Sequence, residues 1–118
     1  MNDDPTEVDV LYARVQMKNE SDNDNFQNVA DQISNVFYKN GYVRRQYDNV
    51  KLHVTLLNSL FRKDGSDKRT TFDASYILEK YKNYEFGSGV FKSIDLSIRF
   101  STGKNGYYDS VVSIPVSR

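Results

Sequence analysis

The sequence predicts a small α+β domain with a mainly antiparallel sheet and two helices packed on one face. Apolar residues at every second position indicate strands, and apolar residues at every third or fourth position indicate helices. The two kinds of segment follow one another in the order β-α-β-α-β-β. Polar residues alternate with apolar ones along the strands, which favours antiparallel pairing with one solvent-facing side. The length of 118 residues fits one domain, and 38% hydrophobic residues suffice for a core despite a mean hydropathy of −0.68.

The first half of the chain predicts a strand followed by an amphipathic helix. Residues 7–17 are rich in β-branched and apolar side chains and form the strand. One face of this strand carries Leu11, Ala13, Val15 and Met17, and the other carries Val8, Val10 and Tyr12. A polar turn over residues 18–25 leads into a helix over residues 25–39. Gly41 stands where a left-handed residue commonly ends a helix.

The strand predicted over residues 50–57 has the clearest alternation. Its even positions are Val50, Leu52, Val54 and Leu56, which we expect to pack on the helices. The period of two then places Lys51, His53 and Thr55 together on the opposite, open face.

The second half of the chain predicts a loop, a short helix and a hairpin. Residues 63–71 offer nothing to bury and indicate an exposed loop. Asp73 caps the short helix that follows, and Phe72 packs against its first turn. Residues 91–101 alternate up to Phe100, residues 102–106 form a turn, and the returning strand is lined by Tyr108, Val112, Ile114 and Val116. The sequence shows no repeat and no domain boundary.

Composition excludes several classes of site. Sixteen basic residues balance sixteen acidic ones, which argues against a bulk polycationic nucleic-acid binder. Without cysteine there is no disulfide framework, Cys-ligated zinc or cysteine nucleophile, and we expect no cofactor or metal. No apolar run reaches the roughly 18–20 residues that span a bilayer, so we expect no membrane contact. The acidic start, residues 1–5, is untypical of a targeting peptide, favours an intracellular protein and resembles the interior of a longer chain.

His53 is the single histidine, and two interpretations of it remain open. It can be an ordinary surface or half-buried side chain of a strand. It can instead belong to a phosphate site in which the imidazole transfers a proton, Thr55 hydrogen-bonds a phosphoryl oxygen and Lys51 offsets the charge. Such chemistry usually needs two proton-transfer groups on opposite sides of the phosphorus, and one is present.

Basic residues are enriched around this strand. They are Arg44, Arg45, Lys51, Arg62, Lys63, Lys68 and Arg69. Of these, Lys51, Arg62 and Lys63 are our candidates for contacts with RNA phosphates, and ordinary solvated surface is the alternative.

The chain resembles the 2H phosphoesterase superfamily, in the branch of the A-kinase anchoring protein 7 nuclear-localisation-signal domain. The similarity runs through residues 1–15, residues 50–64, Phe72-Asp73…Ile77-Leu78, residues 84–88 and the closing hairpin, and so covers essentially the whole chain. The resemblance implies a bilobal fold in which each lobe supplies one His-x-Thr or His-x-Ser motif. Relatives with both motifs process RNA through 2′,3′-cyclic phosphates without a metal, one histidine acting as base and the other as acid.

Carried onto this sequence, the resemblance makes His53 the histidine of the second motif and Thr55 its phosphate-binding hydroxyl. Residues 1–118 then correspond to the C-terminal lobe, with the first-motif lobe and a KH-type RNA-binding domain lying upstream. The segment between Asp64 and Phe72 is shorter than in longer relatives.

Three functions remain open. The resemblance implies that the chain is a catalytically incomplete part of a nuclear complex for transcription coactivation and DNA alkylation repair, contacting RNA or the other subunits; the cytoplasm is the alternative location. It can be an RNA 2′,3′-cyclic phosphodiesterase that obtains its second motif from a homodimer partner or a missing lobe. It can also be a structural fragment with an exposed sheet face.

Overall fold

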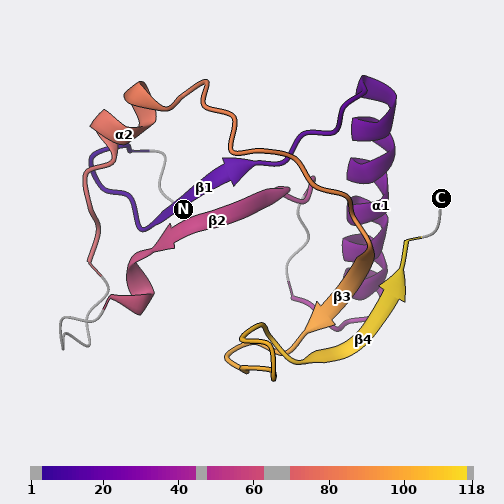
Figure 1. Ribbon diagram of the computed structural model, residues 1–118. Helices are drawn as coiled ribbons and strands as arrows, with labels where there is room; N and C mark the ends of the chain where they lie inside the picture. Colours follow the sequence, from indigo (N-terminus) through magenta and orange to yellow (C-terminus); the bar gives the residue numbers. More distant parts are fainter. Residues whose placement is uncertain (1–3, 45–47, 63–69, 117–118) are drawn as a thin grey trace. The chain divides into compact units, whose positions relative to one another are not determined.

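The computed structural model describes residues 4–44, 48–62 and 70–116 (Figure 1). Along the chain, the elements are β1 (Val10–Arg14), α1 (Glu20–Lys39), β2 (His53–Asn58), the 3-10 helix η1 (Ser59–Phe61), α2 (Ser75–Lys80), β3 (Ser93–Ser97) and β4 (Ser110–Pro115). This is the predicted β-α-β-α-β-β order with one added 3-10 turn, so the α+β class is confirmed. No helix in the described residues is both long and apolar enough to cross a bilayer.

The four strands pair as two antiparallel two-stranded sheets, where the sequence predicts one sheet. β1 pairs with β2, and β3 pairs with β4. The two pairs belong to two compact units, Met1–Lys82 and Asn83–Arg118, and residues 84–92 form no helix or strand. The packing of both helices on one face of a common sheet stays a prediction.

The β1–β2 pair contains a β-bulge, and this bulge decides on which face of the pair each side chain lies. Tyr12 lies opposite Thr55, but Leu11 lies opposite Leu57, so Leu56 is an extra residue on β2. Opposite residues of an antiparallel pair lie on the same face. The bulge therefore places Leu57 with Leu11, on the face away from Thr55 and Tyr12, although strict alternation predicts Leu57 on the Thr55 face.

Helix α1 starts at Glu20, five residues before its predicted start, because the polar turn is itself helical. Its last turn has the geometry of a Schellman motif. Gly41 adopts a φ of +75° and donates its N–H to the carbonyl of Tyr38, while Tyr42 donates to the carbonyl of Phe37. The rings of Phe37 and Tyr42 meet edge to face, with centroids 5.9 Å apart. The predicted role of Gly41 is confirmed.

The apolar centre of the first unit lies where the chain before β1 meets the segment before α2. Val8 and Phe72 exchange both backbone hydrogen bonds at 2.9 Å. Among the hydrophobic residues that the structure describes, Val8 and Ala74 are the buried ones. Asp73 accepts a hydrogen bond from the N–H of Ser75 (2.8 Å) and so contacts the first turn of α2 as predicted, although the capping position itself is Ala74.

In the second unit, β3 and β4 pair so that Ile94 lies opposite Ile114 and Leu96 lies opposite Val112. The predicted alternation through Phe100 is wrong beyond Ser97, because β3 ends there and Phe100 adopts a φ of +63°. The predicted turn over residues 102–106 is present, with Gly106 at a φ of +78° donating its N–H to the carbonyl of Gly103 (3.0 Å).

We predict that Gly41→Ala destabilises the chain by about 1–2 kcal/mol, the cost of a Cβ in the left-handed region. The added Cβ meets no atom within 4 Å, so the loss comes from the backbone alone. Urea unfolding followed by circular dichroism at the helix band measures it. Gly89→Ala is the matched control, because its φ lies outside the left-handed region and its Cβ also meets nothing. Equal stabilities of the two variants would contradict the Schellman assignment.

We predict that Asp73 contributes stability that is lost in acid. The side-chain and backbone hydrogen bonds from Ser75 hold the pKa of Asp73 below its ordinary value of 3.8. Because the folded-state pKa is the lower one, this contribution is fully present above pH 3.8 and disappears as the pH falls through the folded-state pKa. An NMR titration of the carboxyl group checks the shift. Ser75→Ala should move the pKa back toward 3.8 only in part, because the backbone N–H remains.

Candidate phosphate-binding site

The candidate residues His53 and Thr55 lie at the start of β2, and both side chains are exposed. Lys51 precedes the strand by two residues and is also exposed. Thr55 lies opposite Tyr12 of β1, which therefore shares its face. His53, Thr55 and Tyr12 thus lie on one face of the β1–β2 pair, whose two strands run side by side in Figure 1. We call this face the polar surface.

Tyr12 is the centre of this surface. Its ring meets the imidazole of His53 edge to face, with centroids 5.4 Å apart. The ammonium group of Lys51 lies over the same ring, 5.2 Å from its centroid. A cation over a tyrosine ring and an edge-to-face aromatic pair are each attractive. The structure therefore brings Lys51, His53 and Thr55 together around one aromatic side chain.

The orientation of the His53 ring is set by the backbone. Its Nδ1 lies 2.6 Å from the carbonyl oxygen of Lys51. A carbonyl oxygen can only accept, so Nδ1 carries the proton and donates it to this bond. In the neutral ring Nε2 then bears the lone pair, and in the charged ring Nε2 is a second donor.

Helix α1 holds the segment that enters β2. Gln27 donates from Nε2 to the carbonyl of Val50 (2.8 Å), and the N–H of Val50 donates to Oδ1 of Asp31 (2.6 Å). The two side chains are four residues apart on one helix face and bond each other at 3.0 Å. Both backbone groups of Val50 are therefore held next to Lys51, which fixes where the alternation of β2 begins.

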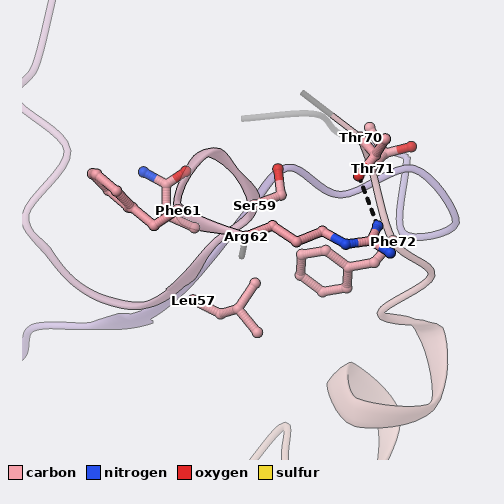
Figure 2. A pocket seen from close by; sticks show the side chains of 8 residues that line it. Leu57, Ser59, Phe61, Arg62, Thr70, Thr71 and Phe72 are labelled. Atoms are coloured by element: carbon pink, nitrogen blue, oxygen red, sulfur yellow. Dashed lines mark hydrogen bonds between the residues drawn. The ribbon is translucent and has the colours of Figure 1, made fainter. Parts of the chain in front are cut away.

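In the described part of the chain, the other basic residues predicted to contact RNA phosphates are not among those gathered around Tyr12. Arg62 follows η1, at the opposite end of β2 from His53. Its Nη1 donates to the hydroxyl of Thr70 at 2.9 Å, and both residues line an open pocket at that end of the strand (Figure 2). Arg44 is exposed in the turn after α1, and Lys63 lies outside the described residues, as do Arg45, Lys68 and Arg69. The assignment of Arg62 and Lys63 to RNA phosphates stays a prediction.

Sequence reasoning missed the three residues that organise the surface. Tyr12 was placed on a face with Val8 and Val10, and only the strand register brings it beside His53. Gln27 and Asp31 are two of several polar residues of α1. Their spacing of four residues, which places them on one helix face, is the sequence signal that could have identified them. Among the described residues, no three His, Cys, Asp or Glu side chains gather so as to hold a metal ion.

Comparison with known proteins identifies the family. The model of the AKAP7 2′5′ RNA ligase-like domain matches residues 1–116, a range that runs through both compact units. Activating signal cointegrator 1 complex subunit 1 of Mus musculus is 36% identical over 126 residues, which cover 93% of this chain. The chain spans about a third (35%) of the length of that relative. It therefore belongs to the family of AKAP7 2′5′ RNA ligase-like domains and is 2H phosphoesterase-like.

Proposed function

We propose that this chain contacts RNA phosphates through the polar surface of β2 and is catalytically incomplete as a phosphoesterase. The gathering of Lys51, His53 and Thr55 around Tyr12 carries the proposal. An ammonium group, an imidazole and a hydroxyl on one exposed surface are donors that bind a phosphodiester. The match to an RNA ligase-like domain family supports RNA as the source of that phosphate.

Catalytic incompleteness is inferred from the number of histidines. Metal-free cleavage of an RNA phosphodiester needs one group to take a proton from the attacking oxygen and another to give one to the leaving oxygen. His53 is the single histidine of the 118 residues and can perform one of these steps. Binding needs only donors and positive charge, so the surface keeps its affinity for phosphate without a second histidine.

We further propose that the chain acts within a multi-subunit complex in the nucleus. The relative from Mus musculus is named as a subunit of the activating signal cointegrator 1 complex, and this supports the other subunits of that complex as partners. Roles in transcription coactivation and DNA alkylation repair would follow from that membership. Isolation of the tagged chain from nuclear and cytoplasmic extracts, with identification of the associated proteins, tests location and membership together.

The RNA proposal predicts a loss of salt-dependent binding in Lys51→Gln. Each phosphate neutralised on a single strand contributes about 0.7 to the slope of log affinity against log salt. Fluorescence anisotropy with a labelled single-stranded RNA should show a slope smaller by about 0.7. Lys92→Gln, an exposed lysine of the other compact unit, is the control and should keep the parent slope. If the parent chain shows no salt-sensitive RNA affinity, RNA contact is excluded and contact with partner proteins remains.

The same surface predicts that Tyr12→Ala weakens RNA binding about three- to tenfold, whereas Tyr12→Phe changes it little. The contacts to His53 and Lys51 use the ring, and each is worth about 0.5–1.5 kcal/mol. The NMR shifts of the His53 ring protons report its position directly: they should move in Tyr12→Ala and stay in Tyr12→Phe. Unchanged ring shifts in Tyr12→Ala would contradict the positioning role.

Hydrolysis of a 2′,3′-cyclic nucleotide tests the catalytic half of the proposal. We expect no turnover that His53→Ala abolishes, because the chain contains no second histidine. The mass of the parent chain in solution should be measured on the same sample. Turnover that depends on His53 and appears only in a dimer would overturn catalytic incompleteness and establish the phosphodiesterase with a shared site.

A further inference from the structure

The chain contains two Asn-Gly pairs, and the structure holds their asparagine side chains in opposite directions. Asn40-Gly41 ends helix α1, and Asn105-Gly106 lies in the turn that joins β3 and β4 (Figure 1). Both asparagines are exposed. A glycine after an asparagine has no side chain to hinder its backbone nitrogen, so this nitrogen can approach Cγ of the asparagine closely. Each pair is therefore a place where an asparagine can lose its amide nitrogen.

The side chain of Asn40 is bonded backward along the helix. Its Nδ2 donates to the carbonyl of Val36, four residues earlier, at 2.8 Å. This hydrogen bond directs the amide group back over the last turn of α1, whereas Gly41 follows Asn40 in the chain. The bond also engages Nδ2, the atom that would have to leave. The helix therefore opposes attack on this amide.

The side chain of Asn105 is bonded forward, across the glycine. The N–H of Tyr107 donates to Oδ1 of Asn105 at 3.1 Å. The ring that this hydrogen bond closes contains both Cγ of Asn105 and the backbone nitrogen of Gly106, so the bond folds one toward the other. A donor on Oδ1 also stabilises the negative charge that this oxygen gains when Cγ is attacked. No hydrogen bond joins Nδ2 of Asn105 to another described residue.

The glycine nitrogens themselves are held alike at the two sites. Gly41 donates its N–H to the carbonyl of Tyr38, and Gly106 donates to the carbonyl of Gly103, both at 3.0 Å. Either bond must open before the nitrogen can attack, so this step slows both sites. The direction of the asparagine side chain is what distinguishes them.

We infer that Asn105 is a site of spontaneous deamidation and that the helix end protects Asn40. The backbone nitrogen of Gly106 loses its proton and bonds to Cγ of Asn105, while the bond from Cγ to Nδ2 breaks and Nδ2 leaves as ammonia. Water then opens the succinimide ring at either carbonyl, which gives aspartate or isoaspartate. Water is consumed and ammonia is released, and no atom is oxidised or reduced.

The modification would alter the hairpin of the second compact unit. A carboxylate in place of the amide adds a negative charge to the turn, next to Lys104. An isoaspartate also carries the backbone through Cβ and Cγ, which lengthens the turn just before Tyr107, whose ring meets that of Tyr108 edge to face at 5.5 Å. The polar surface belongs to the first compact unit and takes no part, so the inference goes beyond the proposed function.

The test incubates the full chain at physiological temperature and slightly alkaline pH. Peptide mapping by mass spectrometry follows the exchange of amide for carboxyl at each asparagine. We expect Asn105 to convert about three- to tenfold faster than Asn40, because the hydrogen bond to Val36 must break at Asn40. In a urea concentration that unfolds the chain the two rates should converge, since both residues precede glycine.

Two variants of Tyr107 separate its N–H from its ring. Tyr107→Pro removes the N–H that Oδ1 of Asn105 accepts and should slow conversion of Asn105. Tyr107→Ala keeps the N–H and should convert as the parent chain does, and its exposed position makes a folding defect a small risk. Circular dichroism of each variant verifies that the fold is retained.

Three results would contradict the inference. Asn40 converts as fast as Asn105 in the folded chain; the difference between the two sites persists in urea; or Tyr107→Ala slows Asn105 as much as Tyr107→Pro. The native and unfolded rates of the parent chain decide the first two without any variant, so a misfolded proline variant does not remove the test.

Discussion

The polar surface depends on two hydrogen bonds at Val50: Gln27 donates to its carbonyl, and its N–H donates to the carboxylate of Asp31. A strand presents alternate residues to opposite faces, so a shift of one residue moves every side chain to the other face. By holding both the N–H and the carbonyl of Val50, helix α1 fixes the chain immediately before Lys51. The pairing of His53 with Arg14 then continues from that point into the ladder. A helix side chain and a strand register together decide that imidazole, hydroxyl and ammonium share a face.

The extra residue in β2, Leu56, decides where the polar surface ends along the strand. Before the bulge, Thr55 shares a face with Tyr12, and after it Leu57 joins Leu11 on the opposite face. Without the bulge, Leu57 would extend the polar row with an apolar side chain. With it, Leu57 instead faces the pocket that Arg62 borders. One strand thus carries a polar surface at its start and a mostly apolar pocket beyond its end, and Leu56 marks the change between them.

Local patterns predicted what depends on local geometry. The alternation of residues 50–57 correctly placed His53 beside Thr55, and Gly41 was identified because few other residues end a helix in the left-handed region. Contacts between segments distant in sequence escaped prediction. Nothing in residues 7–17 alone indicates that Tyr12 lies opposite Thr55, because the register depends on the partner strand. The predicted strand position of Phe100 was wrong for another reason. The apolar alternation of the sequence continues past Ser97, but the backbone leaves the strand there.

The two ends of β2 differ in what holds their functional side chains, and this difference governs how each can work. At the start of the strand, the imidazole of His53 is oriented by the carbonyl of Lys51 and the ring of Tyr12. At the other end, Arg62 is held by the hydrogen bond that its Nη1 donates to the hydroxyl of Thr70. His53 is therefore positioned by Lys51 and Tyr12, and Arg62 by a residue eight positions further along the chain.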